Sequence, residues 1–289
     1  MGPIIAGHEP CGVVVARGAG VTDRQARMGA QVMNHHYYGC GSCRHCRQGW
    51  SQLCRAGYVV YGFTGHGGHA PYMKVPASTL VPLPDELSFE EGAAISCGTG
   101  TAYHALRRMQ LVGGDTLAVF GQGPVGLSAT LLASAMGARV IAVDVGAERL
   151  ALARNFGADA VIDGRDSDPV AALKALTHGE GVDLAIDCSG APEARVAAVR
   201  ATRTWGTVCY VGEGKTVTLD VSQDLLRRQL TLIGSWTFSS VGQEEAARFV
   251  AQHRIPLHRL ITHRFALADA AAAYQLFDTQ TTGKGVFVF

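Results

Sequence analysis

The stretch from Thr116 to Asp144 constrains the fold of this chain more than any other. An apolar run leads into a turn, a helix-length segment of small apolar residues follows, and a second apolar run ends on Asp144. The turn reads Gly121-Gln122-Gly123-Pro124-Val125-Gly126. This order predicts a strand, a glycine-rich loop, a helix and a second strand, which together form a dinucleotide-binding unit.

Each glycine of the turn has a separate expected role. Gly121 lets the chain leave the strand sharply, Gly123 lets bare backbone approach a pyrophosphate, and Gly126 lets the helix pack close to the sheet. Pro124 and Val125 complete the loop. The phosphates are expected at the helix N-terminus, where N–H groups and the helix dipole favour anions. The alternative is a glycine-rich turn that binds nothing.

The acid that closes this unit indicates which dinucleotide it takes. Asp144 lies 23 residues after Gly121, where a carboxylate accepts hydrogen bonds from both hydroxyls of the adenosine ribose. The same charge would repel the extra phosphate of NADP, so the sequence predicts NAD. Arg149 follows five residues later and could also reach the ribose, although it could equally be solvated.

Composition excludes several other classes of protein. The 289 residues suffice for two domains, and 25 basic against 24 acidic residues give no sign of a nucleic-acid or anionic-membrane partner. The apolar runs are strand-length and broken by glycine, and the first residues lack the pattern of a signal peptide. We therefore expect a soluble protein that does not bind a membrane and is located in the cytoplasm.

A cysteine cluster at 39–54 predicts a structural zinc site. Its members are Cys40, Cys43, Cys46 and Cys54. Four thiolates at this spacing can surround one zinc ion tetrahedrally in a lobe too short to have its own core. Disulfides fit poorly without a secretory signal, and an iron–sulfur cluster is a weaker alternative. His45 is expected to be solvated.

A second metal-binding hypothesis concerns His8 and Glu9, which precede a strand expected at 13–16. An imidazole beside a carboxylate can ligate a metal ion, although such a pair alone is more often a polar turn. The remaining cysteines, Cys11, Cys188 and Cys209, are interpreted as core thiols.

Beyond Asp144, strands and helices alternate, which predicts a parallel, doubly wound sheet that binds ligands at the carboxyl ends of its strands. Cys188-Ser189-Gly190 and Val211-Gly212-Glu213 fall at two such ends. Its strands are expected at 160–162, 182–187, 207–211 and 231–234, and its helices near 147–156, 170–177, 193–202 and 223–228. An amphipathic helix at 244–252 and a strand at 286–289 are expected in the last part of the chain, outside this alternation.

Taken together, these motifs resemble the zinc-dependent medium-chain alcohol and polyol dehydrogenases. The resemblance covers essentially the whole chain. It rests on Gly7-His8-Glu9, the four cysteines, His66 to Tyr72, Cys97 to Tyr103, the glycine loop with Asp144, and Gly283-Lys284-Gly285. It implies an α/β protein with a Rossmann domain at 100–236. A GroES-like, β-rich catalytic domain is then expected at 1–99, and the chain is expected to return to it at 237–289.

The resemblance also implies roles for single residues. His8 corresponds to a ligand of the catalytic zinc, and Glu9 to a carboxylate that lies close to the ligands without binding the zinc, or to an alternate ligand. Cys97 corresponds to the late ligand, although a lone cysteine is more often a small buried apolar residue. Lys284 corresponds to a basic residue near the pyrophosphate. The implied reaction is zinc-assisted hydride transfer between NAD and a small alcohol, polyol or carbonyl substrate, in a homo-tetramer or dimer. The identity of the substrate does not follow.

One departure from the family concerns the start of the chain. Family members carry a few tens of residues before Gly-His-Glu, including a cysteine ligand and the start of a proton relay, whereas seven residues precede His8 here. We therefore expect the catalytic domain to be N-terminally incomplete. The alternatives to a dehydrogenase are a non-catalytic NAD-binding remnant and a zinc-free quinone or enone reductase.

Overall fold

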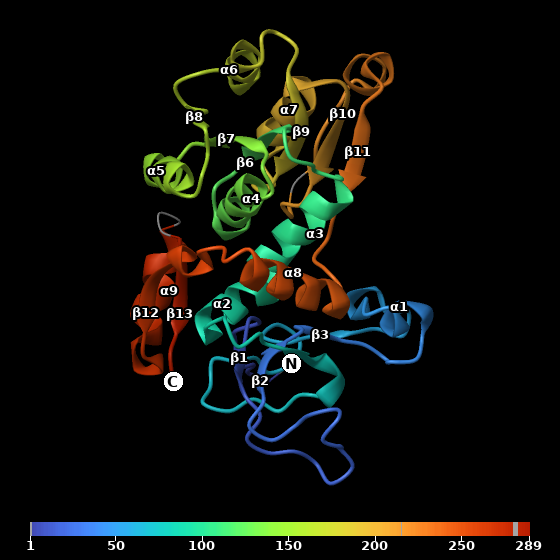
Figure 1. The fold of residues 1–289 in the computed structure, drawn as a ribbon, viewed down its shortest axis with the longest axis vertical. Coiled ribbons are helices and arrows are strands. Elements are labelled where there is room, and N and C mark those ends of the chain that lie inside the picture. Colours follow the sequence, from blue (N-terminus) through green and yellow to red (C-terminus); the bar gives the residue numbers. More distant parts are fainter. Residues whose placement is uncertain (1, 215, 280–282) are drawn as a thin grey trace. The chain divides into compact units, whose positions relative to one another are not determined.

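The structure is a computed structural model that describes residues 2–214, 216–279 and 283–289. The chain forms two compact units (Figure 1). Unit 1 contains Met1–Gly100, Thr237–Tyr274 and Gly285–Phe289, and unit 2 contains Thr101–Trp236 and Gln275–Lys284. The whole of 237–289 was expected to belong to the catalytic domain, whereas 275–284 fall in unit 2.

Unit 2 is built on a six-stranded parallel sheet in the order β11-β10-β9-β6-β7-β8. The strands are β6 (Thr116–Phe120), β7 (Arg139–Asp144), β8 (Ala160–Asp163), β9 (Val182–Asp187), β10 (Thr202–Tyr210) and β11 (Thr231–Gly234). The chain runs outward from β6 to β8 and then returns to β9 beside β6. The strand order therefore reverses between β6 and β9, where ligands bind in sheets of this kind. The predicted doubly wound parallel sheet is confirmed.

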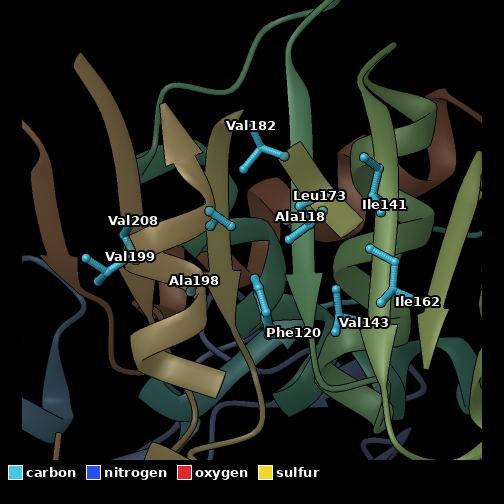
Figure 2. Close-up of a cluster of buried hydrophobic side chains, with 12 residues drawn as sticks. Ala118, Phe120, Ile141, Val143, Ile162, Leu173, Val182, Ala198, Val199 and Val208 are labelled. Carbon is cyan, nitrogen blue, oxygen red and sulfur yellow. The ribbon is translucent and has the colours of Figure 1, made fainter. Parts of the chain in front are cut away.

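Helices cover both faces of this sheet. They are α4 (Pro124–Ala135), α5 (Ala147–Asn155), α6 (Pro169–Leu176) and α7 (Pro192–Ala201). The first two pack on β6, β7 and β8, and α6 and α7 pack against each other (Figure 1). Figure 2 shows the buried apolar cluster of this unit, in which Phe120 and Ile141 of the sheet lie with Leu173 and Val199 of these helices.

Two elements of unit 2 differ from the sequence prediction. The expected helix at 223–228 is a π-helical turn, Val221–Leu225, followed by a 3-10 turn, Leu226–Arg228. The Asp220 carboxylate caps its start by accepting from two backbone N–H groups, and Gln229, with φ of 51°, ends it. Strand β10 also begins five residues earlier than expected, and its pairing with β9 shifts register before Thr207.

Unit 1 contains short, mostly antiparallel strands. A three-stranded sheet joins β1 (Cys11–Val13), β2 (Gln31–Asn34) and β5 (Leu80–Pro82), and pairs form between β3 (Tyr37–Tyr38) and β4 (Val59–Val60) and between β12 (Ile261–Phe265) and β13 (Lys284–Phe287). The strand expected at 13–16 differs from β1, which ends at Val13. Gly29, whose N–H donates to the Val14 carbonyl, adopts φ of 77° and turns the opposing segment away, and Val15 is 58% exposed.

Unit 1 also contains helices. They are α1 (Arg44–Arg47), α2 (Phe89–Ala94), α8 (Ser240–Gln252) and α9 (Ala270–Asp278), the last of which ends in unit 2. Ser88 and Glu91 form a reciprocal capping box on α2, and Ser239 caps α8. Helix α2 packs on β1 and β2 around the buried Met33. Within the described residues, no helix has both the length and the apolar character needed to cross a bilayer.

Candidate functional site

The structure brings together His8, Glu9 and Cys97. One potential ligand atom from each residue lies within 4.8 Å of the other two, and all three side chains are half-buried. The His8 Nε2 and Glu9 Oε1 atoms are 3.9 Å apart. An imidazole, a carboxylate and a thiolate form a donor set that suits zinc, and three protein ligands leave one tetrahedral position for substrate or water.

Cys97 is placed by an irregular helical segment. Between α2 and α3 (Gly100–Arg108) the chain makes a π-helical turn, Ile95–Thr99. Such turns are rare and occur often at functional sites. A Cβ at Gly100 would lie 2.6 Å from the Ile95 carbonyl oxygen and 2.8 Å from the Phe238 ring, so only glycine fits where the turn ends.

The His8 segment is placed by the residues between His66 and His69. Gly67 N donates to the Ile5 carbonyl at 2.7 Å, Gly68 N donates to that of Gly7 at 2.7 Å, and His69 N donates to that of Ala6 at 2.9 Å. A Cβ at Gly67 would lie 2.1 Å from the Gly7 carbonyl oxygen, so the two backbones meet at a distance that only glycine permits. The His66 motif therefore holds the segment that carries His8 and Glu9.

The four cysteines of the lobe also converge. One sulfur from each of Cys40, Cys43, Cys46 and Cys54 lies within 4.8 Å of the other three, and none of them forms a disulfide. Cys40 N donates to Cys54 Sγ, and Cys43 N donates to Cys40 Sγ, both at 3.3 Å. Hydrogen bonds from Ser42 and from backbone N–H groups lower the pKa of the Cys40 thiol to about 5. Burial raises the pKa of the Cys46 thiol to about 12, so a cation is needed to hold all four sulfurs as thiolates. The convergence of the four sulfurs fits a structural zinc ion.

The glycine loop of unit 2 has the shape that a dinucleotide requires. Gly121 adopts φ of 86°, and a Cβ there would lie 2.8 Å from that of Ser189. Gly123 is the N-cap of α4, and no atom lies within 4 Å of where its Cβ would be. Open space at a helix N-terminus beside bare backbone is what a pyrophosphate needs. Pro124 and Val125 form the first turn of α4.

Asp144 has a structural role that the sequence did not predict. Its carboxylate is 6% exposed and accepts from Gln122 N, Val145 N and Gly146 N, which ties the glycine loop to the end of β7. Arg149 Nη1 lies 3.9 Å from the Asp144 carboxylate. The proposed contacts of Asp144 and Arg149 with a ribose stay predictions. So does the role of Lys284, a buried residue that opens β13.

Several buried polar residues close to these sites were not predicted from the sequence. Asp187, at the end of β9, is fully buried and accepts from Ser189 N, Gly190 N and Arg195 Nε. In unit 1, His35, His36, Ser96 and Gln243 form a hydrogen-bonded network. The two adjacent histidines, between β2 and β3, were a visible signal, since polar residues that become buried must find hydrogen-bond partners.

Comparison with known proteins gives the family. Residues 1–85 match the family model described as alcohol dehydrogenase GroES-like domain, and residues 124–252 match that described as zinc-binding dehydrogenase. An uncharacterized zinc-type alcohol dehydrogenase-like protein of Escherichia coli, YphC, is 42% identical, over 99% of this chain and 81% of its own length. The sorbitol dehydrogenase of Bombyx mori is 35% identical, over 95% of this chain and 79% of its own.

A solved structure agrees with this assignment. Alcohol dehydrogenase TADH from Thermus sp. ATN1 superposes with a TM-score of 0.91 at 30% identity, covering 99% of this chain and 85% of its own. The chain therefore belongs to the zinc-binding alcohol dehydrogenase family, and the predicted combination of GroES-like and Rossmann folds is confirmed.

The expectation of an incomplete catalytic domain is not supported. The GroES-like family model matches from residue 1 to residue 85. The expectation assumed that the catalytic zinc depends on a cysteine upstream of His8. The structure brings three potential ligands together at His8, Glu9 and Cys97.

Proposed function

We propose that this protein is a zinc-dependent dehydrogenase that transfers a hydride between an alcohol or polyol and NAD. The observation that carries the proposal is the convergence of His8, Glu9 and Cys97 within 4.8 Å. A bound zinc ion would supply a Lewis acid that lowers the pKa of an alcohol hydroxyl, and NAD would accept the hydride. A zinc-free quinone or enone reductase would have no use for this donor set, and neither would a non-catalytic remnant.

The residues of the chain would divide the work as follows. His8 and Cys97 hold the metal, and Glu9 serves as third ligand or as a carboxylate that orients His8. The backbone at Gly123 and the N-terminus of α4 bind the pyrophosphate. Asp144 presents a buried negative charge at the end of β7, which disfavours the extra phosphate of NADP.

Metal content and activity, measured on the same samples, test this proposal. The purified protein should hold about two zinc ions per chain, one of them in the cysteine lobe, and should produce NADH with some members of a panel of alcohols and polyols. His8→Ala should lose about one zinc ion and the activity. His45→Ala, which changes a histidine of the lobe outside both clusters, should lose neither. A zinc-loaded protein that oxidises no alcohol or polyol contradicts the proposal.

Three further properties belong to the proposal. The sorbitol dehydrogenase among the relatives supports a polyol as substrate. A cytoplasmic location and a homo-tetramer or dimer are expected from the family resemblance. Light scattering coupled to size-exclusion chromatography measures the oligomeric state.

A further inference from the structure

A buried polar network includes Ser96, the residue before Cys97. The Nδ1 atom of His36 is 2.8 Å from the carbonyl oxygen of Ser96. The Ser96 hydroxyl accepts from Gln243 Nε2 at 3.1 Å, and Gln243 Oε1 is 3.2 Å from Nδ1 of His35. All four side chains are at most 2% exposed. The network therefore joins three separate segments of unit 1 in a space without bulk water.

The hydrogen bonds determine where the protons are. A carbonyl oxygen only accepts, so His36 carries its proton on Nδ1 and donates it to Ser96. Gln243 donates its amide N–H to the Ser96 hydroxyl. The amide oxygen, which only accepts, therefore faces His35, and His35 also carries its proton on Nδ1. Burial lowers the pKa of His36 to about 3 and that of His35 to about 4. Both imidazoles are therefore neutral donors at neutral pH.

His36 contacts the surroundings of two ligands at once. The Ser96 carbonyl belongs to the peptide group that carries the amide nitrogen of Cys97. The ring of His36 lies edge-on to that of His8, with centroids 5.3 Å apart and an interplanar angle of 66°. Cys97 and His8 come from segments far apart in the chain, and His36 contacts the carbonyl of the residue before Cys97 and the ring of His8.

The position of His36 is itself fixed by backbone hydrogen bonds. Its carbonyl accepts from Tyr61 N at 3.0 Å, and the preceding residue, His35, donates its N–H to the Thr79 carbonyl at 2.7 Å. The Phe238 ring packs edge-on against the imidazole, with centroids 5.8 Å apart. His36 is therefore held in place on several sides, and it can in turn fix the positions of His8 and Cys97.

We propose that His36 is a positioning residue of the metal site, which orients Cys97 through the Ser96 carbonyl and His8 through ring contact. The inference rests on the proposed function, since it assigns a role toward the ion expected at His8, Glu9 and Cys97. Partners that orient ligands in this way contribute about 10- to 100-fold to metal affinity.

Two substitutions separate the two contacts. His36→Phe keeps a ring against His8 but removes the donor to Ser96, and it should weaken Zn²⁺ binding at this site about 10- to 100-fold. His36→Asn places an amide N–H near the position of Nδ1 but removes the ring, so it should lose less affinity. Ser96→Ala is the matched control, because it removes the hydroxyl and keeps the carbonyl that His36 contacts.

The measurement is Zn²⁺ affinity by competition with a chelator, together with the absorption bands of the Co²⁺-substituted protein. The cysteine lobe serves as an internal reference, and its ion should be unaffected in every variant. A merely structural role would lower the thermal stability without changing the ratio of the two metal affinities or the cobalt bands.

The outcomes distinguish this inference from the proposed function. If wild type and His8→Ala hold the same number of ions, the proposed metal site fails and this inference fails with it. If His8→Ala loses an ion but His36→Phe binds Zn²⁺ as tightly as wild type, only the role of His36 is overturned. If His36→Phe does not fold, unchanged cobalt bands in folded His36→Asn overturn the inference.

Discussion

A Cβ at Gly126 would lie 1.7 Å from the carbonyl oxygen of Gly121. The first turn of α4 therefore packs against the loop backbone with no room for a methyl group. We expect Gly126→Ala to displace the loop, to destabilise the protein by about 1–3 kcal/mol and to abolish measurable NAD binding. Thermal denaturation and calorimetric titration with NAD measure the two effects.

Gly123→Ala provides the matched comparison in the same loop. No atom lies within 4 Å of a Cβ at Gly123, so the free protein should keep its melting temperature. The added methyl group would occupy space expected for the pyrophosphate, and NAD affinity should fall at least about tenfold. Unchanged affinity would show that the open side of Gly123 does not face the cofactor.

Asp144 is expected to set the preference for NAD over NADP. In Asp144→Asn the charge that repels a ribose phosphate is lost, so the ratio of kcat/KM for NAD to that for NADP should fall by about tenfold or more. Stability should also fall, because the native carboxylate accepts three backbone N–H groups. Asp163→Asn is the control, since Asp163 lies opposite Asp144 in the register of β7 and β8 and changes the same side chain on the neighbouring strand. An unchanged ratio in Asp144→Asn would contradict the assignment.

The buried His35 predicts a loss of stability in acid. Burial lowers its pKa to about 4, against 6.5 for an accessible imidazole. Between these values the unfolded chain binds a proton that the folded protein does not, so the free energy of unfolding decreases as pH falls from 6.5 toward 4 and is insensitive to this group above 6.5. The slope due to this group is about 1.4 kcal/mol per pH unit.

Urea denaturation between pH 5 and pH 7.5 on wild type and His35→Phe measures this slope. The variant should be less stable at neutral pH, because the Gln243 amide oxygen loses its donor. In the acid range, the number of protons taken up on unfolding should be smaller by about one than in wild type. Parallel curves for the two proteins would show that His35 is protonated as easily in the folded state as in the unfolded chain.

Substitution in the cysteine lobe should have a local effect. Cys54 is buried within the four-sulfur cluster, so Cys54→Ser should remove about one zinc ion per chain and make the segment around 39–57 sensitive to protease. Cys209→Ser changes a fully buried thiol in β10 and should leave the zinc content unchanged. Metal analysis and limited proteolysis with mass spectrometry follow both variants. Full zinc content in Cys54→Ser would show that three thiolates suffice.

The features that could be predicted from sequence depend on short spacings. The glycine loop, the four cysteines and the alternation of strands and helices after Asp144 each occupy a continuous stretch, and local geometry translates them directly into structure. Cys97 was selected through family resemblance, because no local pattern distinguishes a ligand from a small core residue there. Its convergence with His8 is visible only in three dimensions.

The rest depended on contacts between distant segments. The hydrogen bonds of the π-helical turn at Ile95–Thr99 span one residue more than those of an α-helix, and the apolar pattern of the sequence does not reveal this. Gln243 occupies an unremarkable place in α8, yet it donates to Ser96 across 147 positions of the chain. The partners that buried polar groups require can be anticipated, but which residues provide them depends on the packing of the whole unit.

The two groups of potential metal ligands differ in the length of chain that a bound ion would restrain. The cysteines from Cys40 to Cys54 lie within one short segment, and an ion bound there would order little beyond the lobe itself. An ion at His8, Glu9 and Cys97 would instead close a loop of roughly ninety residues, for which the entropy removed from the unfolded chain is larger. An ion at the reaction centre would therefore also act as a long-range cross-link, so that metal depletion would lower the free energy of unfolding of unit 1 as well as remove the activity.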